Sequence, residues 1–250
     1  MTRILLSGAG GKMGRVITAS AAQREDCIIV AGLDPMAENS SFSFPVFPAP
    51  AQCTVAADVI VDFSHPSCLE PLLQYAIGHS LPAVIATTGL SQEQVEAIHQ
   101  ASRKIPIFFS ANMSLGVSLL AELAKKAAAV LGGQFDIEII EKHHNQKLDA
   151  PSGTALLLAD AISSQLKNPP RYEYDRHSKR AKRGKNEIGI HSVRGGTIVG
   201  EHQVLFAGRD EVITLSHTAM SKEVFATGGI NAALFLANRQ PGLYNMGNLI

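Results

Sequence analysis

The chain has 250 residues and no formal net charge, because 22 Lys and Arg side chains balance 22 Asp and Glu. A chain of this length buries roughly 70–75% of its unfolded surface and forms one or two domains with proper cores. Zero net charge argues against a nucleic acid or an anionic membrane as the main partner. No apolar stretch approaches the ~20 residues that span a bilayer, and the amino end lacks a signal-peptide pattern. We therefore expect a cytoplasmic protein whose three cysteines, Cys27, Cys53 and Cys68, stay reduced.

The amino-terminal segment has the pattern of a dinucleotide-binding unit. The apolar run Ile4–Leu6 is followed at once by SGAGGKMGR, residues 7–15, and then by a helical apolar face. A glycine turn between a strand and a helix exposes backbone N–H groups and directs the helix N-terminus at a pyrophosphate. The same pattern also closes ordinary strand–helix units that bind no nucleotide. The candidate cofactor-binding residues of the turn are Gly8, Ala9, Gly10, Gly11, Lys12 and Met13.

The second predicted strand ends at Asp34, about 20 residues beyond the glycine turn. An acid at this position accepts hydrogen bonds from the ribose hydroxyls of a dinucleotide. The alternative is that Asp34 and Pro35 only open a turn. No Arg or Lys lies between Asp34 and Pro50, so a ribose phosphate has no local cationic partner. We expect NADH to be favoured over NADPH, with Lys12 able to soften that preference.

Strands and helices then alternate along the first half of the chain. Residues 35–52 predict a surface loop; strands follow at 59–63, 83–86 and 107–109, separated by helices. This order predicts a doubly wound parallel sheet, in which ligands bind outside the carboxyl ends of the strands. Each loop there is either a cofactor contact or a plain turn. The candidates at these ends are Ala86, Thr87 and Thr88, and Ser110, Ala111, Asn112 and Met113.

The pattern changes after residue 114. Residues 115–131 are apolar nearly all round and predict a buried helix, and residues 135–139 alternate as in a half-buried strand. Three β-rich runs, at 187–194, 197–207 and 211–219, are separated by short gaps that favour antiparallel neighbours. We expect a second, α+β domain with a mostly antiparallel sheet. A helix at 225–238 is expected to pack back on the first domain, with an irregular tail after it.

The segment 138–155, EIIEKHHNQKLDAPSGTA, concentrates the groups that carry chemistry. His143 trades a proton near neutral pH, and Lys147 brings a positive charge and a proton donor. His144 and the helix start at 152–154 can each bind a carboxylate. This set suits a small dianionic substrate that is protonated as it is reduced. The alternatives are a polar turn, a solvated lysine and a simple Ser152 N-cap. No acidic ligand stands at a regular spacing, so we expect no metal.

A basic run follows at 171–185, in which Arg171 is followed by six further cations: Arg176, Lys179, Arg180, Lys182, Arg183 and Lys185. It is either a nucleic-acid patch or a solvated loop that closes over an anionic substrate. Only two aromatic residues interleave with the cations, and the net charge is zero, so we favour the loop.

Residues 141–155, EKHHNQKLDAPSGTA, closely resemble the signature of the dihydrodipicolinate (4-hydroxy-tetrahydrodipicolinate) reductase family. The turn at 8–15, GAGGKMGR, is also similar to that family, although it is far less specific. Three further motifs match it in order, so the resemblance spans the chain. They are DFSHP at 62–66, TTG at 87–89 and GEH at 200–202.

The resemblance implies NAD(P)H-dependent reduction of a dicarboxylate, 4-hydroxy-tetrahydrodipicolinate, to tetrahydrodipicolinate in lysine and diaminopimelate biosynthesis. It implies a dinucleotide-binding domain at 1–113, joined by 223–250, a substrate and oligomerisation domain at 114–222, and a homotetramer. His143 and Lys147 would be catalytic, while His144, Gly153 and Thr154 would hold the substrate.

Two positions depart from the family pattern. Pro35 stands where some members carry an Arg, and Lys222 stands where an Arg can occur, which puts an anion-binding role for that position in doubt. The competing hypotheses are another Rossmann imine or carbonyl reductase and a non-catalytic NAD-sensing protein. Neither requires the PSGTA segment, and the sensor needs neither His143 nor Lys147.

Overall fold

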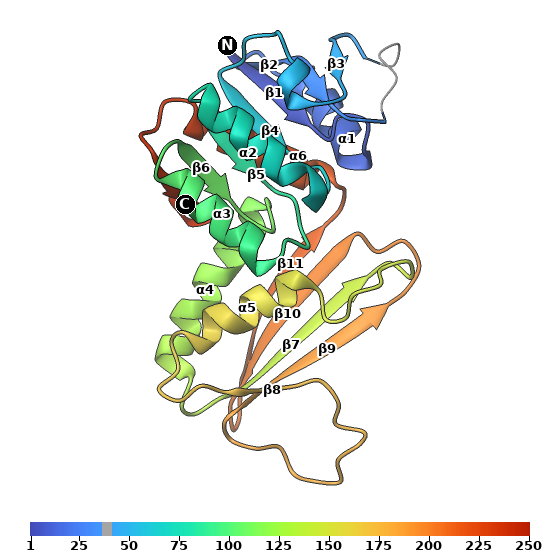
Figure 1. The fold of residues 1–250 in the computed structure, drawn as a ribbon. Helices are drawn as coiled ribbons and strands as arrows, with labels where there is room; N and C mark the ends of the chain where they lie inside the picture. Colours follow the sequence, from blue (N-terminus) through green and yellow to red (C-terminus); the bar gives the residue numbers. More distant parts are fainter. Residues whose placement is uncertain (37–41) are drawn as a thin grey trace. The chain divides into compact units, whose positions relative to one another are not determined.

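The structure, a computed structural model, describes residues 1–36 and 42–250 (Figure 1). The chain divides into two compact units, and each is described by itself. Unit 1 comprises Met1–Leu115 and Lys222–Ile250, and unit 2 comprises Gly116–Ser221.

Unit 1 is built on a parallel sheet of seven strands in the order β12-β6-β5-β4-β1-β2-β3. Strand order reverses around β1, which lies between β4 and β2, as in a Rossmann-type doubly wound fold. The predicted fold class is thus confirmed. The register pairs Ser7 with Asp62, so the carboxyl ends of the two central strands meet where such folds bind ligands. The strands are β1 (Thr2–Ser7), β2 (Cys27–Leu33), β3 (Val46–Phe47), β4 (Val59–Asp62), β5 (Ala83–Ile85), β6 (Pro106–Phe109) and β12 (Gly242–Tyr244).

Two apolar cores lie on the two faces of this sheet. Along β1, Ile4 and Leu6 join one core and Leu5 joins the other, because successive strand side chains point to opposite faces. Helices α1 (Lys12–Ala21) and α6 (Glu223–Leu236) close the first core, and α2 (Leu69–Gly78) and α3 (Gln92–Ser102) close the second. Helix α3 starts with the predicted capping box between Ser91 and Gln94.

Two expectations for unit 1 were wrong. Part of the predicted surface loop at 35–52 belongs to the core, because Phe44 and Val46 are buried and Val46–Phe47 forms β3. Residues 37–41 of this loop lie outside the described residues. The expected irregular tail contains β12, which pairs in parallel with β6. Strands of two or three residues carry too little pattern to predict, and their pairing with a neighbouring strand decides them.

Unit 2 holds a five-stranded sheet in the order β11-β10-β7-β9-β8. Its pairings are antiparallel on either side of β10 and parallel on either side of β9, so the sheet is mixed. Helices α4 (Leu115–Leu131) and α5 (Gly153–Ser163) supply apolar side chains to the same core as the sheet. The strands are β7 (Asp136–His143), β8 (Arg171–Glu173), β9 (Glu187–Arg194), β10 (Gly200–Ala207) and β11 (Val212–Ala219).

Two details of unit 2 differ from expectation. The run at 187–194 does not pair with the run at 197–207, because β7 lies between them; the connecting segment crosses the end of that strand. The helix at 115–131 is not buried all round. Its stripe Leu115, Leu119 and Leu123 is 46%, 47% and 45% exposed, while the face with Leu120 and Ala124 enters the core.

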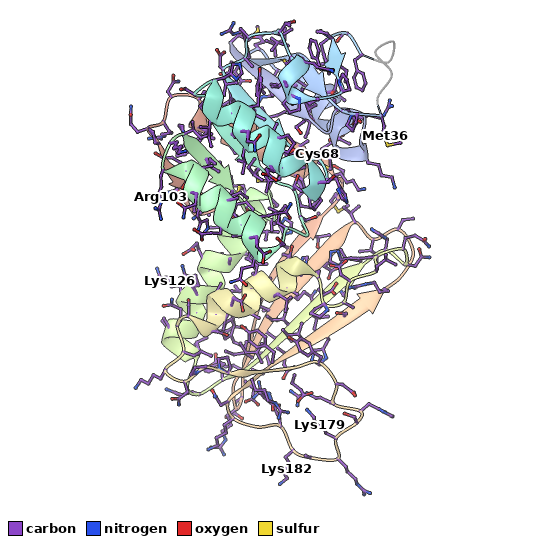
Figure 2. All side chains as sticks on the ribbon, viewed as in Figure 1. Met36, Cys68, Arg103, Lys126, Lys179 and Lys182 are labelled. Atoms are coloured by element: carbon purple, nitrogen blue, oxygen red, sulfur yellow. The ribbon has the colours of Figure 1, made fainter. Side chains whose placement is uncertain are left out.

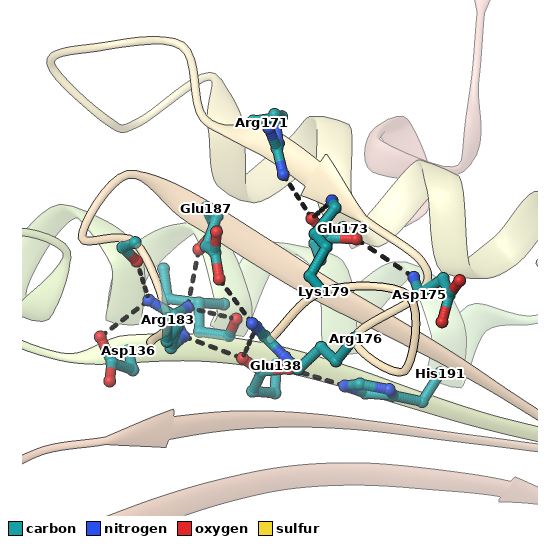
Figure 3. Close-up of polar contacts among 12 residues, drawn as sticks. Asp136, Glu138, Arg171, Glu173, Asp175, Arg176, Lys179, Arg183, Glu187 and His191 are labelled. Atoms are coloured by element: carbon teal, nitrogen blue, oxygen red, sulfur yellow. Dashed lines mark hydrogen bonds and ion pairs between the residues drawn. The ribbon is translucent and has the colours of Figure 1, made fainter. Parts of the chain in front are cut away.

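The basic run between β8 and β9 is held by acidic side chains of the same unit (Figure 3). Glu138 accepts hydrogen bonds from Arg176, Arg183 and His191 at 2.9, 2.9 and 2.7 Å, and Lys179 pairs with Glu173. Figure 2 shows Lys179 and Lys182 on this segment. Internal ion pairs thus use several of the cations on which the nucleic-acid alternative was based.

Candidate active site

His143 is the last residue of β7, and its side chain is almost fully buried. Alternation along the strand places it on the same face as Glu141, and Glu141 Oε2 lies 2.5 Å from His143 Nδ1. Burial lowers the pKa of His143, and the contact with Glu141 only partly opposes this effect. The imidazole is therefore mainly neutral at neutral pH.

The helix start at 152–154 forms where it was predicted. Ser152 is the N-cap of α5, and its hydroxyl accepts the Ala155 N–H at 3.2 Å. Gly153 and Thr154 make up the first turn, where the positive end of the helix dipole favours an anion. The same Ser152 hydroxyl lies 3.0 Å from Nε2 of His202. The Ser152 side chain thus both caps α5 and contacts a residue of β10.

Lys147 lies in the turn that joins β7 to α5. Its ammonium forms an ion pair with Asp149 at 2.8 Å and is partly exposed. The neighbouring His144 is half-buried, and its carbonyl accepts the Lys147 N–H at 3.2 Å. The two predicted histidines, the lysine and the helix start therefore all belong to one β7–turn–α5 segment of unit 2.

His202 is buried beside His143, with 5.2 Å between the two ring centroids. Burial, with a smaller contribution from the nearby His143, lowers its pKa to about 4, so it is neutral at neutral pH. It lies on β10, the strand next to β7. From the sequence, His202 was noted only as part of the GEH motif at 200–202, with no role predicted for it.

In unit 1, the glycine turn has the shape that a dinucleotide needs. Gly8 has a φ of +80°, and a Cβ there would meet the Phe63 carbonyl oxygen at 2.6 Å. A Cβ on Gly14 would meet the Gly8 carbonyl oxygen at 2.2 Å, so only glycine allows α1 to start so close to β1. The N-cap residue Gly11 has no side chain to bond the first N–H groups of α1. This helix start fits a pyrophosphate.

Asp34 lies at the end of β2 next to this turn. Its carboxylate accepts the Gly10 N–H at 2.8 Å and the Met36 N–H at 2.9 Å. A carboxylate offers about four acceptor positions, so room remains for ribose hydroxyls. Arg15 also lies close, donating to the Gly10 carbonyl at 3.3 Å, and the sequence did not single it out as a cation of this region.

The other predicted cofactor loops contain both buried and exposed residues. Met113 and Ala86 are buried, while Thr88 and Ala111 are exposed. Ser110 donates its hydroxyl to the Asn112 carbonyl at 2.7 Å and so shapes its loop. Any nucleotide contact of a buried member would involve its backbone.

A buried carboxylate, Asp62, connects two of these strand ends. It accepts the hydroxyls of Ser64 and Thr87, both at 2.6 Å. Thr87 in turn accepts the Ser64 N–H at 3.1 Å. Burial raises the pKa of Asp62 despite these bonds. The Thr87 hydroxyl is therefore used to fix the loops.

Among the residues that the structure describes, no group of three or more His, Cys, Asp or Glu side chains is arranged to hold a metal ion. In the same ranges, 1–36 and 42–250, no helix combines the length and apolarity needed to cross a bilayer.

Family models cover both halves of the chain. The model described as dihydrodipicolinate reductase, N-terminus, matches residues 2–113, and the one described as dihydrodipicolinate reductase, C-terminus, matches residues 116–250. A relative named 4-hydroxy-tetrahydrodipicolinate reductase from Caldanaerobacter subterraneus is 50% identical, covering 100% of this chain and 98% of its own. One of the same name from Clostridium novyi is 48% identical with the same coverage. The chain belongs to the dihydrodipicolinate reductase family.

Solved structures agree with this membership. The dipicolinate-bound dihydrodipicolinate reductase from Paenisporosarcina sp. TG-14 is similar with a TM-score of 0.82 and 28% identity, covering all of both chains. An oxidoreductase from Agrobacterium radiobacter, solved with NAD⁺, has a TM-score of 0.57 at 11% identity over 95% of this chain and 88% of its own. The second likeness shows the fold alone.

Sequence reasoning missed the groups that surround His143 in this reductase. Glu141 was detectable, because an acid two residues before a strand-end histidine lies on the same face. Arg194, which contacts Glu141, stands 53 positions away in sequence, and only the pairing of β9 with β7 brings the two together.

Proposed function

We propose that this chain catalyses the NAD(P)H-dependent reduction of 4-hydroxy-tetrahydrodipicolinate to tetrahydrodipicolinate, in the lysine and diaminopimelate pathway. Full-length similarity to reductases of that name carries the proposal. The β7–turn–α5 segment supports it, because the two predicted histidines, Lys147 and the start of α5 all lie on this one segment.

The first turn of α5 and His144 are proposed to hold the two carboxylates of the substrate. Gly153 and Thr154 lie at the positive end of the helix, where a carboxylate is stabilised. The related Paenisporosarcina enzyme was solved with dipicolinate, itself a dicarboxylate. The ammonium of Lys147 adds a positive charge at the same segment.

Lys147 is proposed as the proton donor. The His143 ring is mainly neutral at neutral pH because burial lowers its pKa, whereas a lysine ammonium carries a transferable proton. With Lys147 as the donor, the proposed role of His143 is to orient the substrate and to exchange protons with it through Nε2. When bound, the reduced nicotinamide supplies the hydride. The residues proposed to hold it are the glycine turn at 8–13, Asp34 and the loops at 86–88 and 110–113.

We propose NADH as the favoured cofactor, with NADPH also accepted. The carboxylate of Asp34 suits ribose hydroxyls and repels a 2′-phosphate. Lys12 and Arg15, both exposed beside the turn, leave NADPH usable. The cytoplasm is the proposed location, in keeping with three free thiols.

The test measures nicotinamide absorbance with purified protein and substrate made in situ from pyruvate and aspartate semialdehyde by the preceding synthase. NADH and NADPH are tried separately. Oxidation that depends on the synthase, faster with NADH, is expected. Nucleotide binding without any oxidation would reject the reductase and favour a nucleotide sensor.

A further inference from the structure

Glu141 is a buried carboxylate that touches both ends of the β7–turn–α5 segment. Its side chain is 0% exposed. One oxygen, Oε2, lies 2.5 Å from His143 Nδ1, and the other, Oε1, accepts the Ser152 N–H at 3.1 Å. The proposed acid–base residue and the N-cap of the substrate-binding helix are thus tied to one carboxyl group.

Arg194 holds that carboxylate in a fixed orientation. Its Nη1 donates to Oε2 at 2.8 Å and its Nη2 to Oε1 at 2.7 Å, a two-pronged pairing that fixes the carboxylate plane. Nη2 also donates to the Asp149 carbonyl at 2.6 Å, next to the turn that carries Lys147. In the sheet register Arg194 stands beside His143. Burial opposes ionisation of Glu141, but hydrogen bonds led by that from Arg194 outweigh it and lower its pKa to about 2.

An ionised carboxylate only accepts hydrogen bonds, so the contact with Glu141 requires a proton on Nδ1 of His143. In the neutral ring, Nε2 then carries the lone pair. A Cβ on Gly200 would approach Nε2 to 3.3 Å, so the glycine leaves that side of the ring uncrowded. The ionised carboxylate of Glu141 therefore fixes both the tautomer and the orientation of the His143 ring.

We propose that Glu141, oriented by Arg194, is a positioning residue for the reaction: it holds His143 in the Nδ1–H tautomer, presents Nε2 to the substrate and ties the ring to the start of α5. The inference rests on the role of His143 in the proposed function. A purely structural role is the competing explanation, because removing one member of any buried ion pair is destabilising.

The deciding variant is Glu141→Gln, which keeps the size of the side chain but offers an N–H donor. The His143 tautomer is read from ¹⁵N chemical shifts of the ring nitrogens in histidine-labelled enzyme, with His143→Asn identifying the signals. We expect the wild-type ring to carry its proton on Nδ1 and the variant ring on Nε2. The expected fall in kcat is about 10²–10⁴, the usual contribution of general acid–base catalysis. A triad aspartate replaced by asparagine lowers kcat for the same reason, because the histidine tautomer is wrong. KM for NADH is expected to stay unchanged, and Glu141→Asp to recover part of kcat.

The matched control is Glu138→Gln. Glu138 is on the same strand and also accepts from arginines and a histidine, but it lies on the other sheet face. The Glu138→Gln variant is expected to leave the His143 tautomer unchanged. If Glu141→Gln does not fold, Arg194→Lys takes its place; it keeps the charge, loses the two-pronged contact and is expected to mix the tautomers and lower kcat.

A folded variant with the wild-type tautomer, or one with a changed tautomer and wild-type kcat, would overturn the inference. The tautomer is read without turnover. An inactive wild-type enzyme would therefore count against the proposed reaction, whereas an Nδ1–H ring in Glu141→Gln would count against this inference.

Discussion

At the scale of single residues, the site combines a cation of moderate exposure with a buried, neutral imidazole. Lys147 is partly exposed and pairs with Asp149, so its proton can be replaced from solvent. His143 is shielded and tied to an ionised acid. Two proton-carrying groups in different surroundings can take different roles in one reaction.

Replacing Lys147 with Ala should lower kcat by about 10²–10⁴, the usual range for losing a general acid. His143→Ala is expected to lower kcat by a factor in the same range. The measurement is steady-state NADH oxidation, with a far-ultraviolet spectrum to confirm folding. Lys104→Ala, an exposed lysine of unit 1, serves as the control. An unchanged kcat in a folded variant would remove that residue from the mechanism.

Glu141 also predicts a pH dependence of stability. Its pKa is lowered from 4.5 to about 2 in the fold, so ionised Glu141 stabilises the native state above pH 4.5, and this contribution is lost as pH falls towards 2. The melting temperature of Glu141→Gln should therefore lie below that of wild type at pH 6, with the gap narrowing between pH 5 and pH 3. A gap that does not vary with pH would mean that the pKa of Glu141 is the same in the folded and unfolded states.

At the scale of elements, close backbone contacts decide where α1 and the cofactor loops lie. The glycine turn is tight because the Gly8 and Ala9 carbonyls occupy the space where a Gly14 side chain would stand. The loops after β4 and β5 are joined by Asp62 and Thr87. The glycine turn and the Asp62–Thr87 contact both lie at the carboxyl ends of the parallel strands.

Gly14→Ala should weaken nucleotide binding and lower the melting temperature, since its Cβ would meet the Ala9 carbonyl oxygen at 2.5 Å as well as that of Gly8. Binding is measured by NADH fluorescence titration. Gly78→Ala is the control, because no heavy atom lies within 4 Å of its added Cβ. Wild-type affinity and stability in Gly14→Ala would show that α1 can shift without cost.

Thr87→Val should lower the free energy of unfolding by about 1–3 kcal/mol, the cost of leaving a buried hydrogen-bonding group without its partner. The valine removes the hydroxyl that Asp62 accepts while keeping the volume. Urea unfolding is the measurement, and the exposed Thr88→Val is the control. Equal stability of the two variants would mean that water replaces the Thr87 hydroxyl.

At the scale of the whole molecule, unit 2 carries exposed apolar and uncharged surface that a single chain leaves uncovered. Leu119 and Leu123 of α4 are about half exposed. Strand β11 exposes Val212, Thr214, Ser216 and Thr218. We propose that copies of the chain associate through this unit into a homotetramer.

Light scattering after size-exclusion chromatography should give the mass of four chains for wild type. The double variant Thr214→Arg with Ser216→Arg should give a smaller species, because like charges on one sheet face repel across a symmetric interface. Gln100→Arg, on the exposed surface of α3, should leave the mass unchanged. A wild-type monomer, or a tetrameric double variant, would count against this interface.

The sequence alone determined the fold class of unit 1 and the β7–turn–α5 segment, because both depend on local patterns. A glycine turn between strand and helix, an acid ending the second strand and an N-cap after a proline are each readable within a few residues. Tertiary structure decided the rest. The short β3 and β12 exist because a neighbouring strand pairs with them, and β7 separates β9 from β10. The contact of Arg194 with Glu141 depends on that sheet order. Strand pairing joins residues far apart in sequence, and a local pattern does not record such contacts.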